Sequence, residues 1–177
     1  MTEVHIIGQI IGGTGFDNGR NLFCKWGIQA GLNWDRLEGA DSGQTHVDHP
    51  EEGEMAVWAH PLDLHYSCKG LSGWPKIYCQ VWHQDSHGRS DICGYGFCHI
   101  PTSPGTHHVE CVTWVPEGTL WERISAFFIG GYPRLKLEEV VYTPGDRFRL
   151  QTKAGGVIHF ELSVVLKDFE KYNIRYN

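Results

Sequence analysis

The sequence predicts an all-β fold, an antiparallel sandwich of about eight strands with one short helix between late strands. Two observations support this prediction. Short runs in which apolar and polar residues alternate recur along the chain, and turn residues, among them 22 glycines and 8 prolines, separate these runs. The chain has 177 residues and is 41% hydrophobic, so we expect a single domain over residues 1–177 with a substantial core.

The clearest predicted strand is Val157–Leu166. Every second side chain in it is apolar, while His159 and Glu161 fall on the opposite face. Arg147–Gln151 alternates in the same way, and Lys153–Gly156 between the two runs supplies turn residues, which predicts a hairpin. The remaining predicted strands are Glu3–Ile11, Asn21–Ile28, Trp58–Tyr66, Lys76–His83, Ile92–Ile100 and His107–Thr113.

One segment has helical rather than strand spacing. Thr119 and Glu122 form a capping-box pattern, in which each side chain can accept a hydrogen bond from the other's backbone N–H. Apolar residues then follow at helical spacing up to Phe128, and Gly130 begins a stop signal. The sequence therefore predicts one short helix here, packed against the sandwich.

The stretch Gly31–Glu54 is the least regular part of the chain. It contains glycines and acidic residues in no clear period, so we expect a long loop with a short strand near Thr45–Val47. Long loops in compact domains are often binding elements. Three glutamates near the end of this stretch make it a candidate contact region: Glu51, Glu52 and Glu54.

Composition excludes some classes of partner and predicts the compartment. The formal net charge is −6, and no run of Lys and Arg occurs, so nucleic acid is not an expected partner. The first residues lack the pattern of a signal peptide, and no apolar stretch is long enough to span a bilayer. We therefore expect a cytoplasmic protein with reduced thiols, in which Cys24, Cys79 and Cys98 serve as small core residues.

The sequence contains no motif that predicts catalysis. Neither GxSxG nor HExxH occurs, and no CxxC pair suggests a zinc ribbon. The most tempting metal pattern among the eleven histidines is His107 next to His108, but adjacent strand residues point to opposite faces. We expect no catalytic residue and no cofactor.

The segment Gln80–Pro101 carries the most information about function. It reads as strand, acidic loop, strand, a pattern that resembles the calcium-binding loops of C2 domains. Calcium needs six to eight oxygen ligands, but only three of the five corresponding positions are acids here, which predicts no site or weak calcium binding. Asx turns explain Asp85 and Asp91 as well. The five positions are Asp17, Asn21, His83, Asp85 and Asp91.

Segments along nearly the whole chain, in order, resemble the B9-domain family. They are EVHIIGQIIG near the start, LFCKWGI at Leu22–Ile28, HPLDLHY at His60–Tyr66, KGLSGWP at Lys69–Pro75, QVWHQDSHGR at Gln80–Arg89, GYGFCHIPTSPGTH at Gly94–His107, DRFRLQTKAGG at Asp146–Gly156 and the tail KDFEKYNI. The resemblance implies a C2-like sandwich without known enzymatic activity. It also implies a place in the cytoskeleton, at the ciliary basal body and the transition zone.

The resemblance further implies a scaffold role in the Meckel syndrome complex of the transition zone, which cilium assembly and the ciliary membrane diffusion barrier require. The expected partners are B9 domain-containing protein 1 and the Meckel syndrome type 1 protein, which this subunit would bridge, with γ-tubulin as a further partner. On this interpretation, the outer face around His159 and Glu161 is one candidate contact region, and the acidic stretch is the other.

Two other functions compete with the scaffold. The first is a C2-type module that binds phospholipid at the membrane surface with little or no calcium dependence, which would need a full calcium cage or a basic face. The second is a metal-dependent β-sandwich enzyme, which would need convergent ligands.

Overall fold

The computed structural model describes residues 2–17, 19–51, 53–116 and 152–170. Every regular element among them is a β-strand, no α-helix occurs, and no helix capable of crossing a membrane is found in this part of the chain. Most predicted strands are confirmed, with ends that differ by a few residues. The strands are β1 (Thr2–Thr14), β2 (Leu22–Gln29), β3 (Trp34–Gly39), β4 (Ser42–Gln44), β5 (Ala56–Cys68), β6 (Lys76–Gln84), β7 (Ser90–His99), β8 (Gly105–Pro116) and β9 (Thr152–Lys167).

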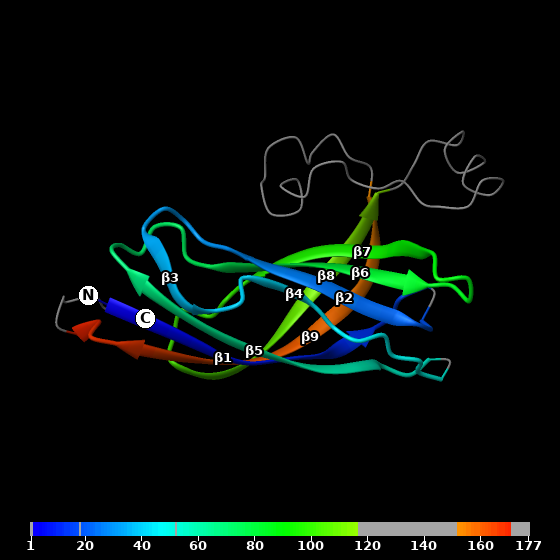
Figure 1. Ribbon diagram of the computed structural model, residues 1–177, viewed down its shortest axis with the longest axis horizontal. Coiled ribbons are helices and arrows are strands. Elements are labelled where there is room, and N and C mark those ends of the chain that lie inside the picture. Colours follow the sequence, from blue (N-terminus) through cyan, green and yellow to red (C-terminus); the bar gives the residue numbers. More distant parts are fainter. Residues whose placement is uncertain (1, 18, 52, 117–151, 171–177) are drawn as a thin grey trace.

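The nine strands form one antiparallel sheet that curls into two layers (Figure 1). Their order is β3-β5-β1-β9-β8-β7-β6-β2-β4. The sheet turns from one layer into the other between β8 and β7, where only Tyr95 and Trp114 are paired. The first five strands in this order make one layer and the last four make the other. The predicted all-β antiparallel fold is therefore confirmed, with nine described strands instead of about eight.

The long loop predicted over Gly31–Glu54 is wrong, because the segment contains β3 and β4. The short strand predicted near Thr45–Val47 lies directly before these residues, as β4. β3 lies at one edge of the sheet and has a single buried residue, Trp34, so it carries no alternation that a sequence could reveal. Thr45 is buried for another reason, since its hydroxyl accepts the N–H of Cys24 at 2.9 Å.

The two edges of the sheet follow one another in the chain. β3 ends at one edge and β4 begins at the other, with only Ala40 and Asp41 between them. Arg36 pairs with Asp41 at 2.9 Å, and the N–H of Ile28 donates to the Asp41 carbonyl at 2.7 Å. This short connection therefore links the two edge strands of the sheet, β3 in one layer and β4 in the other.

The core lies between the two layers and is built from the inward positions of the alternating strands. Ile6, Phe160 and Trp58 are buried representatives of β1, β9 and β5. The indole Nε1 of Trp58 donates to the Leu22 carbonyl at 3.1 Å and so links β5 to β2 in the facing layer. Two of the cysteines expected in the core are fully buried, while Cys98 is half-buried.

The turn predicted at Lys153–Gly156 is also wrong, because these residues belong to β9. Lys153 and Ala154 pair with the end of β8, and Gly155 and Gly156 lie where the register between the two strands shifts. The glycine signal reflects close packing. A Cβ on Gly156 would lie 2.3 Å from the carbonyl oxygen of Thr14, and one on Gly155 would lie 2.6 Å from the hydroxyl of Thr113. The hairpin partner Arg147–Gln151 lies outside the described residues.

The predicted helix after Thr119 also falls outside the described residues and is not borne out.

Candidate functional site

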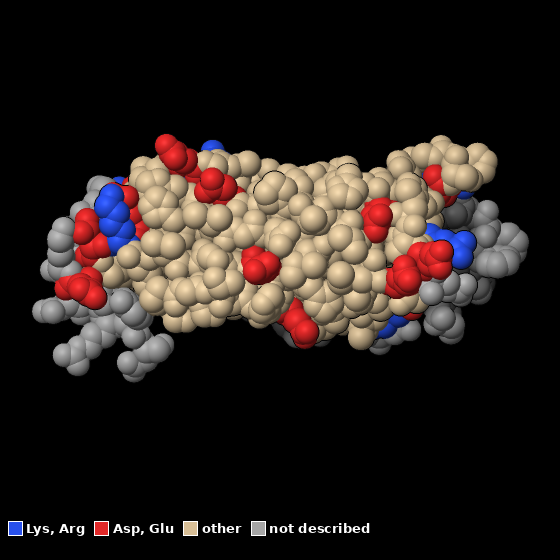
Figure 2. Space-filling model, turned by 90° about the horizontal axis from the view of Figure 1, so that it is seen from below, with Lys and Arg blue, Asp and Glu red and all other residues tan. Residues whose placement is uncertain are grey.

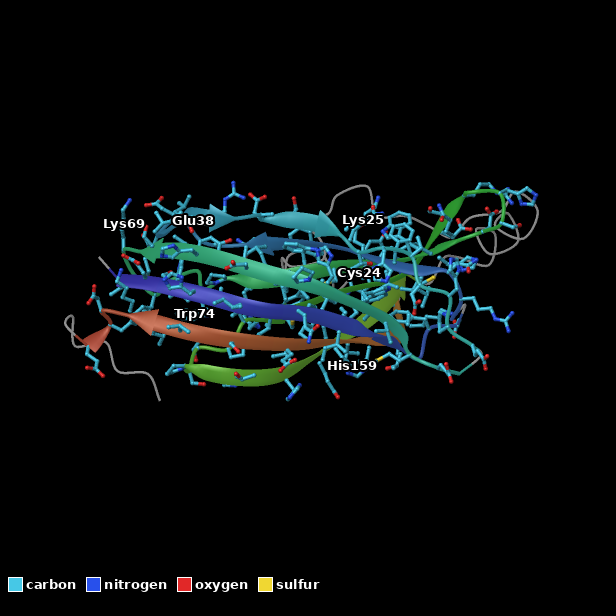
Figure 3. All side chains as sticks on the ribbon, turned by 60° about the horizontal axis from the view of Figure 1, so that its bottom comes forward. Cys24, Lys25, Glu38, Lys69, Trp74 and His159 are labelled. Atoms are coloured by element: carbon cyan, nitrogen blue, oxygen red, sulfur yellow. The ribbon has the colours of Figure 1, made fainter. Side chains whose placement is uncertain are left out.

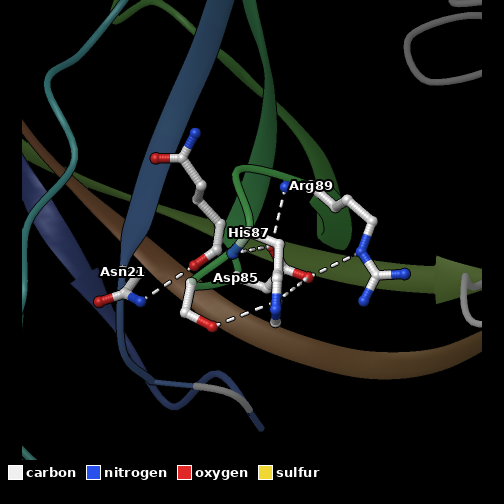
Figure 4. A network of polar contacts seen from close by, with 6 residues as sticks. Asn21, Asp85, His87 and Arg89 are labelled. Carbon is white, nitrogen blue, oxygen red and sulfur yellow. Dashed lines mark hydrogen bonds and ion pairs between the residues drawn. The ribbon is translucent and has the colours of Figure 1, made fainter.

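The β6–β7 loop holds one of the calcium-type positions, Asp85, and is organised around it (Figure 4). Asp85 Oδ1 accepts the backbone N–H groups of His87 and Arg89, each at 2.8 Å. Its Oδ2 accepts the Arg89 Nε–H at 2.8 Å. The Arg89 side chain and these N–H groups lower the pKa of Asp85 to about 2, because they stabilise the ionised carboxylate. Asp85 thus closes a turn, as an Asx residue does.

The two positions where a calcium site would need acids have structural partners of their own. Asn21 has a left-handed backbone, with φ of 53°, and exchanges two hydrogen bonds of 2.9 Å with the backbone of Gln84. The Asn21 side-chain oxygen also contacts the ring of His49. His83 Nδ1 lies 2.6 Å from the Arg20 carbonyl and donates to it. These contacts join the β1–β2 loop to the start of the β6–β7 loop.

The remaining two acids do not complete a cage. Asp17 is exposed and pairs with Lys153, with 2.6 Å between Nζ and Oδ2. Asp91 stands opposite His83 in the β6–β7 ladder. Within the described residues, the only three His, Cys, Asp or Glu side chains whose ligand atoms lie within 4.8 Å of one another are elsewhere: Glu3, His5 and His65.

The predicted contact residues His159 and Glu161 lie at outward positions of β9, on the outer face of the five-stranded layer. Figure 3 labels His159 on this strand. β9 runs between β1 and β8, so it presents a face to solvent and no free edge. Gln9 Nε2 donates to Glu161 Oε2 at 3.0 Å, and the Thr14 hydroxyl lies 2.9 Å from His159 Nε2. Both side chains are therefore half-buried and held in place.

The same outer face exposes apolar side chains that sequence reasoning missed. Ile7 on β1 is 50% exposed and Val165 on β9 is 51% exposed. They are diagonal neighbours, because Ile7 pairs with Ser163 and Val165 pairs with His5. Val57 on β5 and Val112 on β8 are also exposed. The sequence does carry a signal for this surface. In these strands some residues at outward positions are apolar, although the inward positions are apolar as well.

This outer face carries little positive charge. Strands β1, β5 and β8 contain no Lys or Arg, and β9 has only Lys153 and Lys167, one near each end. Figure 2 views this side of the molecule and shows a broad uncharged surface with isolated acidic residues, the basic side chains lying near the two ends. A partner that covers the middle of this face would desolvate few charges.

The second predicted contact region is the acidic stretch before β5. Glu51 and Glu54 are exposed and lie at either side of a turn in which the Glu54 N–H donates to the Glu51 carbonyl at 3.1 Å. Glu52 lies outside the described residues. Glu51 also borders an open surface depression next to the β1–β2 loop, which is lined by Arg20, Asn21, His49, Pro50 and Glu51.

Comparison with known proteins agrees with the resemblance in the sequence. Residues 4–165 match the family described as B9-C2, ciliary basal body-associated, B9 protein. The chain is 52% identical to B9 domain-containing protein 2 of Rattus norvegicus, over 98% of this chain and 99% of that protein. The Drosophila melanogaster protein of the same name is 36% identical over 99% of both chains.

More distant similarities also appear. B9 domain-containing protein 1 of Xenopus laevis is 27% identical to this chain, over 85% of it and 78% of the relative. Among solved structures, a C2 domain of plant Extended Synaptotagmin 1 matches with a TM-score of 0.44 and 14% identity, over 92% of each chain.

Proposed function

The chain belongs to the B9-C2 family of ciliary basal body-associated proteins, and from this premise we propose that it is a non-enzymatic scaffold subunit. In this proposal it bridges two other B9-domain proteins, B9 domain-containing protein 1 and the Meckel syndrome type 1 protein, within the transition-zone complex. It works in the cytoplasm, at the cytoskeleton of the basal body and transition zone, where γ-tubulin is a further partner. Its contribution is to cilium assembly and the membrane diffusion barrier.

The observation that carries this proposal is the outer face of the five-stranded layer. Ile7, Val165, Val57 and Val112 give it exposed apolar area, and its middle carries no Lys or Arg. Apolar side chains between satisfied polar ones, such as the Gln9–Glu161 pair, are typical of protein-binding surfaces. A flat, weakly charged face of this kind suits a folded partner.

A bridge needs a second surface, and the acidic stretch with Glu51 and Glu54 supports one. It lies beside the β1–β2 loop. That loop follows the C-terminal end of β1, whereas Glu3 lies at the N-terminal end of the same strand. Exposed carboxylates favour a partner with a basic patch, because complementary charge steers association. The two regions differ in chemistry, so they suit two different partners.

The phospholipid-binding alternative has weaker support. Two of the three acids at the calcium-type positions are already engaged by cations, Asp85 by Arg89 and Asp17 by Lys153. A calcium-independent mode would need a basic face, and the net charge is −6. Flotation with anionic liposomes, with and without calcium, tests this alternative directly.

The test of the scaffold uses the purified full chain and both sister proteins. Ile7→Lys combined with Val165→Lys should abolish binding of one sister and spare the other, since both positions are exposed and the fold tolerates the change. Charge reversal of Glu51, Glu52 and Glu54 to Lys should have the converse effect. Leu32→Lys, at a fully exposed position on another part of the surface, is the matched control and should leave both partners bound.

Two results would overturn the bridge. One is competition of the two sisters for a single site on this chain. The other is assembly of the sisters with each other, at full strength, when this chain is absent.

A further inference from the structure

A cluster of three metal-ligating side chains lies on the outer face, close to the start of β1. His5 and His65 are directly opposite each other in the β1–β5 ladder, and their rings stack with centroids 3.8 Å apart and planes 19° apart. Glu3 is two residues before His5, so it shares that face. Glu3 Oε2 lies 3.1 Å from His65 Nε2 and 4.0 Å from His5 Nε2.

The three ligand atoms have the chemistry of a transition-metal site. All lie within 4.8 Å of one another, and two are imidazole nitrogens while the third is a carboxylate oxygen. Zinc bonds of 2.0–2.1 Å place neighbouring ligands about 3.3 Å apart, so the cluster needs only a modest contraction and a tilt of the stacked rings. Nitrogen-rich sets of this kind favour zinc-like ions over calcium or magnesium, which prefer oxygen.

We propose that Glu3, His5 and His65 form a binding site for a divalent transition-metal ion of the zinc class, with water filling the remaining position. The side chains are 21%, 33% and 17% exposed, respectively, so an ion can reach them while the sheet shelters one side. Two ligands come from β1 and one from β5, so the ion would cross-link two neighbouring strands. The site lies on the same face as the proposed contact surface, since His5 pairs with Val165, but the proposal does not rest on the scaffold function.

Lys167 sets the affinity of this site. Its Nζ lies 2.9 Å from Glu3 Oε2, where it supplies the positive charge that a metal ion would bring. The Lys167 side chain is 56% exposed and can swing into solvent, so a bound ion replaces it. The lysine is thus a competitor of the metal.

The site is separate from the calcium-type loops. Glu3 is near the first residue of β1 and Asp17 follows its last, and a strand of 13 residues is roughly 40 Å long. The N-terminal end of β1 and the C-terminal end of β9 lie side by side at one end of the molecule (Figure 1). The two regions also differ in the kind of ion that they suit.

The experiment is a calorimetric titration of the reduced full chain with Zn²⁺ at neutral pH. The chain has 11 histidines and 6 cysteines that can bind zinc weakly, so variants must identify the site. His5→Gln and His65→Gln should each remove the tightest site or weaken it at least about tenfold, because one of three protein ligands is lost. His108→Gln, at an exposed histidine on β8 of the same layer, is the matched control and should leave the isotherm unchanged.

A fourth variant tests the competitor. Lys167→Gln should increase the zinc affinity, whereas a cluster that is only an ion pair would gain nothing from this change. The Lys167→Gln variant also keeps the test decisive if a histidine variant fails to fold. Far-UV circular dichroism would reveal such a failure. An isotherm that is the same in wild type and both histidine variants overturns the proposal, as does a Lys167→Gln variant without increased affinity. An excess of Ca²⁺ or Mg²⁺ should not displace the zinc, and displacement by either would also contradict the site.

Discussion

Arg89 Nε lies 2.8 Å from Asp85 Oδ2, and the backbone N–H of the same arginine lies 2.8 Å from Asp85 Oδ1. One residue thus engages both oxygens of the carboxylate that a C2-type calcium site would use. An internal cation therefore closes the β6–β7 loop at the acid where the sequence pattern predicts a weak calcium site or none. This arrangement determines what calcium and acid should do to the protein.

Calcium binding should be weak in the wild type, with a dissociation constant in the millimolar range or above. Combining Asn21→Asp, His83→Asp and Arg89→Gln should increase the affinity at least about tenfold, because two carboxylates are added and the competing cation is removed. Calorimetry measures both proteins. Adding Asp85→Asn to the triple variant is the control and should abolish the gain. Micromolar binding by the wild type would contradict the prediction.

The Asp85 carboxylate should stabilise the fold at neutral pH but not in strong acid. Its pKa is lowered to about 2 from an ordinary value of 3.8, so its contribution is present above the ordinary value and is lost as the pH falls through about 2. Asp85→Asn should therefore melt a few degrees lower than wild type at pH 7, since the group is exposed and the effect small. Thermal melts should show this gap closing between about pH 4 and pH 2. A difference in melting temperature that stays constant down to about pH 2 would count against an ionic origin.

Trp58 should be a main contributor to packing between the layers. Trp58→Phe removes buried volume and the hydrogen bond to the Leu22 carbonyl, which keeps a second donor in the Asp48 N–H at 2.9 Å. We expect a loss of about 1–3 kcal/mol in the free energy of unfolding, measured in urea. Leu32→Ala, at a fully exposed position, should change it by less than about 0.5 kcal/mol. Equal effects of the two variants would refute the packing role.

The glycine at position 156 should not tolerate a methyl group. In Gly156→Ala the new Cβ would meet the Thr14 carbonyl at 2.3 Å, so β9 and β1 would have to separate at a cost of about 1–3 kcal/mol. Gly19→Ala is the matched control, because its nearest neighbour would be 3.7 Å away. That variant should be neutral or slightly more stable, since alanine restricts the unfolded chain. Chemical denaturation of both variants measures the difference, and an equally stable Gly156→Ala protein would disprove the close-packing explanation.

The strands that could be predicted are those in which burial alternates. Val157–Leu166 lies within β9, and Lys76–His83 within β6, because one face of each meets the core. β3 and β4 could not be found in this way, since an edge strand is specified by backbone pairing with a neighbour distant in sequence. The glycines of Lys153–Gly156 had two physical explanations, a turn or a close approach, and only the three-dimensional arrangement distinguishes them.

Candidate sites divide along the same line. The depleted calcium pattern is local, so spacing alone located Asp85 and the loop around it. The cluster of Glu3, His5 and His65 depends on the register between β1 and β5, which places residues distant in sequence opposite each other. No periodicity in the sequence specifies that register. The exposure of Ile7 and Val165 could not be predicted either, because an apolar residue is expected on the buried face of a strand.

The pairing of β1 with β9 also determines how the protein should respond to mechanical load. Glu3 pairs with Lys167, so the start of the first strand and the end of the last lie next to each other in an antiparallel ladder. A force that pulls these two ends apart acts across the ladder at its terminus and breaks the backbone hydrogen bonds one pair after another, instead of shearing them together. In an optical-trap experiment with handles at Thr2 and Lys167, the described domain should therefore open at low force by unzipping, and the Glu3–Lys167 ion pair should break first.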